Sequence, residues 1–231
     1  MKLVIFGANG PTGRLATRQA LDEGHSVTAV TRNPDTFPVG GPNLTVARAD
    51  ALDPAEVRDV IAGHDAVAST LGVPYGSPAA TTMSRFAVNA IEAMRAHGIR
   101  RLVCVTSTGV PMRPPPGETF FYRKVVIPTL IRMGRPLYED AGLAESIVAG
   151  TDLEWTVLRP SGLFDGPRVT DYTVGPPQLR GRFTARRDLA DALVRAAVEG
   201  LYARSVVEVL TREGVPSVYR VFLKEALHLG R

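Results

Sequence analysis

Short apolar or β-branched runs alternate with helix-length segments along the first two-thirds of the chain. Several of these runs are almost continuously apolar, which is typical of parallel strands buried on both faces. They are Leu3–Phe6, Ser26–Val30, Leu44–Ala47, Ala66–Ser69, Leu102–Thr106 and Trp155–Leu158. Strand–helix alternation predicts βαβ units with right-handed crossovers. The sequence therefore predicts an α/β fold: a Rossmann-like, doubly wound parallel sheet in a three-layer αβα sandwich.

The helical segments carry start and stop signals. In Thr81–His97 the apolar residues recur at spacings of three and four, as on one face of a helix, and Gly98 supplies a left-handed stop. Asp53 followed by Pro54 has the form of an N-cap with proline in the first turn. We expect helices at both places.

The pattern changes after about Gly109. We expect a proline-rich loop at Val110–Gly117, two separate helices at Glu118–Met133 and Tyr138–Ala149, a long loop at Gly166–Gly181, a helix at Arg187–Glu199, a strand at Ser205–Val209 and a terminal helix at Val218–His228. We see no repeat and no clear linker. The expectation is one domain over residues 1–231, with a small substrate-side part formed by about 110–150 and 162–231.

Composition and charge narrow the function classes. The chain is 45% hydrophobic, and its 27 Lys+Arg against 23 Asp+Glu give a net charge of +4. The arginines are scattered rather than clustered, so we expect no nucleic-acid partner. No apolar run approaches the ~20 residues of a membrane span, so we expect no membrane partner. A single cysteine, Cys104, excludes an internal disulfide and favours a cytoplasmic location.

The best candidate for chemistry is a glycine-rich turn directly after the first strand. It comprises Gly7, Ala8, Asn9, Gly10, Pro11, Thr12 and Gly13, and a helix follows it. Residues without a Cβ allow a pyrophosphate to approach, and the helix directs its free N–H groups at that phosphate. An ordinary glycine-rich turn is the alternative. The position between strand and helix favours dinucleotide binding.

The end of the second strand indicates which dinucleotide binds. An NAD site would place an acidic residue there for the ribose 2′-hydroxyl, whereas this chain has Thr31 and Arg32. Arg32 can hold a 2′-phosphate, and Arg14 adds positive charge on the same side. The alternative is that both are ordinary surface arginines. We predict NADP(H) in preference to NAD(H).

A series of motifs resembles a known family. In order, they are Gly7–Gly13, Arg32, Ala49–Asp53, Asp65–Gly72, Arg101–Ser107 and Leu153–Pro160. Over about residues 1–210 the chain resembles the atypical short-chain dehydrogenase/reductases with an NAD(P)H-binding domain. The NmrA-like proteins and the flavin/biliverdin reductases lie within that group. The motifs are specific for fold and cofactor, and much less so for the reaction.

The resemblance implies roles for individual positions. Adenine would lie at Asp50 and Ala51, the ribose and pyrophosphate path at Leu71 and Gly72, the nicotinamide at Thr106 and Ser107, and a cover over the ring at Pro160, Ser161, Gly162 and Leu163. Ligands of open α/β sheets bind outside the carboxyl ends of the strands, which agrees with these roles. For Asp53 we prefer helix capping, and Asp188 would act structurally.

The catalytic set departs from the family's better-known form, which combines a serine with Tyr-x-x-x-Lys. Ser107 occupies the serine position. With Glu145 aligned to the family's helix, Leu137 and Ala141 stand where the tyrosine and lysine are expected. Tyr138 is a candidate catalytic residue, with simple packing as the alternative. Alcohol–ketone interconversion is therefore disfavoured.

Two functions from different classes fit these residues. The first is an NADPH-dependent oxidoreductase that passes hydride to a small, apolar or aromatic acceptor such as a flavin, quinone, tetrapyrrole or carbonyl. The second is a non-catalytic NADP(H) sensor of the NmrA-like type that acts through a protein partner. A nucleotide-sugar epimerase is disfavoured, because this chain lacks the proton relay that such an enzyme needs. We expect no metal, because the histidines stand alone.

Two further features keep alternatives open. The apolar stripe from Phe120 to Ile131 could wall a substrate pocket, form a dimer surface or pack against the sheet. The chain could accordingly be a monomer or a homodimer. Cys104 reads as a buried small hydrophobe, and Trp155 as core.

Overall fold

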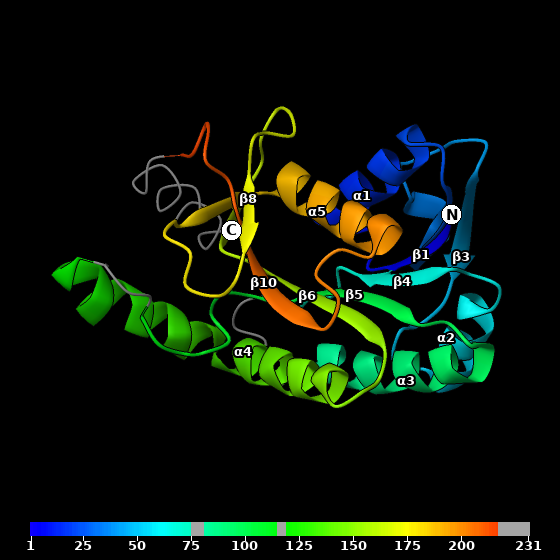
Figure 1. Ribbon diagram of the computed structural model, residues 1–231, viewed down its shortest axis with the longest axis horizontal. Helices are drawn as coiled ribbons and strands as arrows, with labels where there is room; N and C mark the ends of the chain where they lie inside the picture. Colours follow the sequence, from blue (N-terminus) through cyan, green and yellow to red (C-terminus); the bar gives the residue numbers. More distant parts are fainter. Residues whose placement is uncertain (75–80, 115–118, 217–231) are drawn as a thin grey trace.

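A central sheet organises the molecule, whose computed structural model describes residues 1–74, 81–114 and 119–216 (Figure 1). Within that part the sheet has eight strands in the order β3-β2-β1-β4-β5-β6-β10-β8. Their bounds are β1 Lys2–Phe6, β2 Ser26–Thr31, β3 Leu44–Arg48, β4 Ala66–Ser69, β5 Arg101–Val105, β6 Glu154–Pro160, β8 Thr173–Gly175 and β10 Ser205–Leu210. All pairs are parallel except β8 with β10. The predicted doubly wound fold is confirmed.

Side-chain alternation along β1 explains the three layers. Val4 and Phe6 belong to one buried cluster, whereas Leu3 and Ile5 belong to the other. Helices α2 (Pro54–Ile61), α3 (Thr82–His97) and α4 (Ile127–Ala149) cover the first face, and α1 (Pro11–Asp22) and α5 (Arg186–Glu199) cover the second (Figure 1). On the first face the rings of Phe6 and Phe86 lie 4.6 Å apart between centroids. Burial of both sheet faces is the reason that its strands read as continuous apolar runs.

The predicted helix signals are confirmed. The Asp53 carboxylate accepts from the backbone N–H groups of Ala55 and Glu56, at 2.8 and 3.1 Å, and so caps α2. Gly98 ends α3 with φ of +68°, a left-handed conformation that glycine adopts without steric cost. Trp155 is 8% exposed and belongs to the core, as expected.

The region after residue 118 differs from the expectation of two helices. From Ile127 to Ala149 there is one helix, α4, with Pro136 inside it, preceded by the π-helical turn η2 (Tyr122–Val126). This segment projects past the β8 side of the sheet (Figure 1). Phe120 is 80% exposed and Phe121 64% exposed, so packing of the apolar stripe against the sheet is wrong for its first part.

The expected long loop at 166–181 is also partly wrong. It contains β8, which pairs antiparallel with β10 and forms the edge of the sheet. Two further three-residue strands, β7 (Gly162–Phe164) and β9 (Phe183–Ala185), make a small parallel sheet of their own. The predicted helix Val218–His228 lies outside the described residues. Among the residues that are described, no helix is long and apolar enough to cross a membrane.

Candidate functional site

The strand order places a crevice next to the glycine-rich turn. Strands β2 and β4 lie on opposite sides of β1, because the chain builds β2 and β3 on one side and then crosses to β4 on the other. Open α/β sheets bind ligands at the point where the strand order reverses in this way. Gly7 follows β1 with φ of +73°, and a Cβ there would lie 2.9 Å from the Thr70 backbone. A Cβ on Gly13 would lie 2.3 Å from the Gly7 carbonyl oxygen. The turn can form only with glycine at both positions.

The start of α1 suits an anion. Gly10 is the N-cap and provides no side-chain cap, Pro11 fills the first turn, and that turn contains no acidic residue. Thr12 and Gly13 are buried beneath it. The N–H groups of this turn and the positive end of the helix dipole therefore face the crevice without a competing carboxylate. These residues fit the pyrophosphate of a dinucleotide.

Two arginines flank this turn. Thr31 ends β2 in a buried position, and Arg32 after it is exposed. Arg14 donates from Nε and Nη2 to the Asn9 Oδ1 atom, at 3.0 and 2.7 Å. Asn9 in turn bonds Thr36 at 3.5 Å, which ties the glycine turn to the segment after β2. Arg14 is therefore held over the turn by Asn9.

The positions expected to line the adenine and ribose lie after β3 and β4. The Asp50 carboxylate accepts from the Leu52 N–H at 2.9 Å, and the Ala51 carbonyl accepts from Asn89 at 3.1 Å. Leu71 donates its N–H to Ser69 Oγ at 3.3 Å, and Gly72 after it is exposed. Local hydrogen bonds thus shape both loops at the carboxyl edge of the sheet.

A buried charged network lies where β5 and β6 end. Glu145, on α4, accepts from Thr106 Oγ1 at 2.6 Å. The Arg159 guanidinium, on β6, donates to the same carboxylate from Nε at 2.9 Å and from Nη2 at 2.5 Å. The two charged side chains are only 9% and 12% exposed. Both Glu145 oxygens are therefore engaged, and Thr106 is fixed at the end of β5.

Ser107 and Tyr138 lie at the same end of β5. Ser107 Oγ accepts from the Gly109 N–H at 3.1 Å, which leaves its own proton to donate. Tyr138, on α4, is 5% exposed, and its ring lies so close to Gly109 that a Cβ there would be 2.2 Å from Cε1. Both candidate catalytic residues thus pack around one short backbone segment.

The segment Pro160–Leu163 extends β6 over this edge. The Pro160 carbonyl accepts from the Thr108 N–H at 3.0 Å, and Ser161 donates its N–H to Thr184 Oγ1 at 3.0 Å. Gly162 begins β7, and Leu163 is 38% exposed. Pairing of β7 with β9 therefore holds this segment beside the ends of β5 and β6.

Most residues predicted for the site lie in the segments that directly follow β1–β6, whereas Thr12, Gly13 and Arg14 lie in the first turn of α1 and Tyr138 lies on α4. Glu145 was predicted only as an alignment marker and Arg159 only as part of a strand motif. Their signal was a charge within an apolar helix face or an apolar strand, since such charges are buried only when paired.

Cys104, near Glu145, was predicted to be buried, and its residue surface is partly exposed. Desolvation of the thiol and the nearby Glu145 carboxylate raise the pKa of Cys104 to about 12.

The comparison with known proteins decides the family. The profile of the NAD(P)H-binding family matches residues 7–199. The chain belongs to this family. An uncharacterised chloroplastic protein of Arabidopsis thaliana is 26% identical over 228 residues, which cover 93% of this chain and 78% of that protein. The predicted membership of an NAD(P)H-binding family, and with it the binding of a nicotinamide cofactor, is confirmed.

Solved structures confirm the fold of this NAD(P)H-binding protein. A short-chain dehydrogenase/reductase of Veillonella parvula, solved in complex with NADP, has a TM-score of 0.75 at 19% identity and covers 92% of this chain and 95% of its own. ChuY of Escherichia coli O157:H7, an anaerobilin reductase, has a TM-score of 0.74 at 22% identity, with coverages of 94% and 100%. Both likenesses extend over nearly the whole chain.

Proposed function

We propose that the protein is a cytoplasmic NADPH-dependent reductase that transfers hydride to a small, conjugated organic acceptor. One observation carries the proposal: an uncapped, acid-free helix start, two arginines and the Ser107 hydroxyl all lie along one edge of the sheet. The arrangement is what a cofactor needs when its phosphates bind at one end and its reactive ring at the other. The single cysteine supports the cytoplasmic location.

The preference for NADPH rests on Arg32 and Arg14. Arg32 is exposed directly after β2, where the 2′-substituent of the adenosine ribose lies in dinucleotide folds, and no acidic residue ends that strand. Arg14 is oriented by Asn9 on the same side of the turn. A guanidinium pairs with a phosphate by charge-assisted, forked hydrogen bonds. The NADP complex of the Veillonella protein, which shares this fold, adds support.

Around the nicotinamide end, the chain's own groups would orient the acceptor. NADPH, when bound, supplies the hydride, which is two electrons with one proton. Ser107 would donate its hydroxyl proton in a hydrogen bond to an acceptor oxygen and so polarise it. Thr106, fixed by Glu145, would shape the floor beneath the ring. Tyr138 is the candidate for the proton that completes the reduction, because its ring lies against Gly109, two residues from Ser107.

The acceptor class follows from the missing tyrosine–lysine pair. Ala141 is 1% exposed in the core and Leu137 packs beside it, so neither position offers a proton relay. Flavins, quinones and tetrapyrroles can take their proton from water, whereas a simple ketone requires a nearby acid. The anaerobilin reductase that shares the fold supports a tetrapyrrole among these acceptors.

The missing tyrosine–lysine pair also favours a second function, an NADP(H) sensor without turnover that acts through a protein partner. NADPH oxidation with a panel of flavins, quinones, tetrapyrroles and carbonyls separates the two. The reductase predicts turnover with at least one conjugated acceptor, and Ser107→Ala should lower its kcat. Tight NADPH binding without turnover on any acceptor would instead support the sensor.

Cofactor preference is tested at Arg32. We expect Arg32→Ala to raise the Kd for NADPH by about 10- to 100-fold, because one or two hydrogen bonds to a charged group are lost. The Kd for NADH should change little. Arg58→Ala, at an exposed arginine near the end of α2, is the matched control. Equal weakening of both cofactors would remove Arg32 from the specificity argument.

A further inference from the structure

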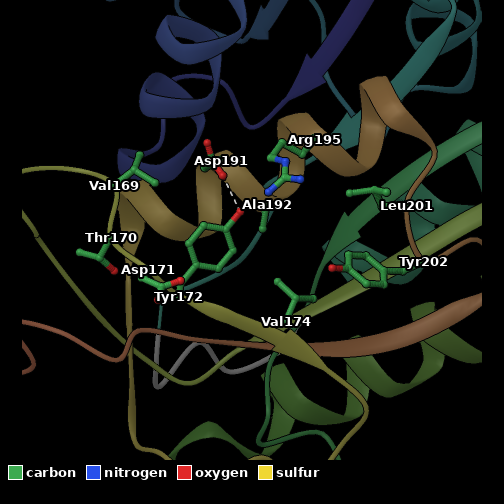
Figure 2. A pocket seen from close by; sticks show the side chains of 10 residues that line it. All are labelled: Val169, Thr170, Asp171, Tyr172, Val174, Asp191, Ala192, Arg195, Leu201 and Tyr202. Carbon is green, nitrogen blue, oxygen red and sulfur yellow. Dashed lines mark hydrogen bonds between the residues drawn. The ribbon is translucent and has the colours of Figure 1, made fainter.

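A cavity of about 340 Å³ opens between α5, the segment before β8 and the turn after α5 (Figure 2). Asp188, in the first turn of α5, accepts from the backbone N–H and the hydroxyl of Thr170, both at 2.8 Å, and holds one wall of the cavity, which is the structural role expected of it. The Asp191 carboxylate and the Arg195 guanidinium both contact the Tyr172 hydroxyl. The opposite charges of this cavity therefore compensate each other.

Charge is less evenly matched in the loop that joins β2 to β3. Arg32 begins this loop, Arg48 ends β3, and Asp35 is the one acidic residue between them in the sequence. Asp35 lies in a short 3-10 turn, η1 (Pro34–Thr36). Arg14, held over the neighbouring glycine-rich turn, adds a third positive charge. The loop is therefore bordered by three arginines and contains a single carboxylate.

The register of the sheet places Arg48 beside the end of β2. Arg48 is paired with Thr31, the residue before Arg32. Neighbouring strands lie about 4.8 Å apart, so the Arg48 backbone is directly next to the point where the loop begins. Side chains alternate along a strand, so Arg48 belongs to the same face as Leu44, which packs in the cluster beneath α1. Arg48 therefore starts on the α1 side of the sheet, which is the side that carries Arg14.

A long ion pair connects Arg48 to the 3-10 turn. The Arg48 Nη2 atom lies 3.9 Å from Asp35 Oδ2, and the two side chains are 68% and 92% exposed. The next residue of the turn, Thr36, contacts Asn9 at 3.5 Å, and Asn9 accepts both hydrogen bonds from Arg14. Two successive residues of η1 thus link Arg48 to Arg14.

The Arg48–Asp35 pair is easily exchanged. An ion pair between exposed side chains contributes little to stability, so Arg48 can leave Asp35 for a stronger partner at low cost. A phosphate near pH 7 carries a charge of about −1.5 to −2 and three acceptor oxygens, and a guanidinium pairs with it through forked hydrogen bonds. Asp35 without a counter-charge would repel the same phosphate. Arg48 therefore favours a phosphate in this loop twice, by attraction and by compensating Asp35.

We propose that Arg48 is a third arginine of the 2′-phosphate site, and that it exchanges Asp35 for the 2′-phosphate when NADPH binds. The inference rests on the proposed preference for NADPH, and it adds a residue from β3 and a change of ion-pair partner to Arg32 and Arg14. NADH has a hydroxyl group in place of this phosphate, so it leaves the Arg48–Asp35 pair intact. Arg48 thus acts on the choice between the two cofactors.

The test measures the Kd of the full chain for NADPH and for NADH by calorimetry, at low ionic strength, where screening is weakest. We expect Arg48→Met to raise the Kd for NADPH about three- to tenfold and to leave the Kd for NADH unchanged. Arg48→Lys keeps the charge and should recover part of the loss. Asp35→Asn should lower the Kd for NADPH about two- to threefold, because it removes the competing carboxylate.

Arg100→Met is the matched control. Arg100 also lies 3.9 Å from an exposed aspartate, Asp152, but it precedes β5 and so belongs to the opposite end of the strands. This variant should bind both cofactors as the wild type does. All of these variants should melt within about 2 °C of the wild type, because both pairs are exposed.

The outcomes separate this inference from the proposed function. If Arg32→Ala weakens NADPH binding and Arg48→Met does not, the role of Arg48 is overturned while the preference for NADPH stands. If Arg48→Met weakens NADPH and NADH equally, Arg48 supports the loop rather than the phosphate, and the inference is again overturned. Equal affinity of the wild-type protein for the two cofactors would overturn both the inference and the proposed preference.

Discussion

Replacing Glu145 by glutamine should destabilise the protein strongly, because it leaves Arg159 charged and buried. The two side chains are 9% and 12% exposed and share two hydrogen bonds, at 2.9 and 2.5 Å. Removal of one partner of a buried pair costs about 3–5 kcal/mol. Glutamine retains one acceptor oxygen, so we expect the low end, about 3 kcal/mol. For a chain of this size that lowers Tm by about 6–12 °C.

Thermal and urea unfolding of single and double variants measure this cost. Glu139→Gln is the matched control, because the Glu139–Arg135 pair at 2.7 Å lies on the same helix with side chains 51% and 69% exposed. Its free energy of unfolding should change by less than about 0.5 kcal/mol. Adding Arg159→Met to Glu145→Gln should recover part of the loss, since the uncompensated charge is then removed. A loss below about 1 kcal/mol for Glu145→Gln would refute burial of the pair.

Two further predictions concern reactivity and exposure. At a pKa of about 12, roughly one Cys104 thiol in ten thousand is ionised near pH 8. A thiol reagent should therefore label the folded protein far more slowly than the denatured protein, and the labelling rate should rise about tenfold per pH unit. Rapid labelling of the folded protein would contradict this prediction. Phe120→Ser should change Tm by less than about 2 °C, because the side chain is 80% exposed, whereas Phe86→Ser, at a core position, should unfold the protein at much lower temperature.

Much of the fold could be predicted because its signals are local. A parallel strand buried on both faces is a continuous apolar run, and the turn from Gly7 to Gly13 requires glycine where any Cβ would collide with backbone. Asp53 and Gly98 likewise act within one helical turn. These features depend on neighbouring residues, and neighbouring residues are what a sequence displays.

The features that were missed depend on contacts between distant segments. Strands β7 and β9 have three residues each, too short for a recognisable period, and they exist because they pair with each other. Two helices were predicted, Glu118–Met133 and Tyr138–Ala149, yet the single helix α4 continues through Pro136, and Tyr138 and Ala141 on the next turn are buried. The Glu145–Arg159 pair forms only when α4 crosses the end of β6.

The polar groups at the end of β5 fall into two sets with different consequences for chemistry. Glu145 uses both oxygens on Thr106 and Arg159, so it holds these two side chains in position. Ser107 accepts from Gly109 and keeps its proton to donate. A site that polarises an oxygen but lacks the tyrosine–lysine relay favours acceptors whose conjugation stabilises added charge until Tyr138 or water supplies the proton. The proposed acceptor class therefore follows from the hydrogen bonds that Glu145 and Ser107 already make at the end of β5.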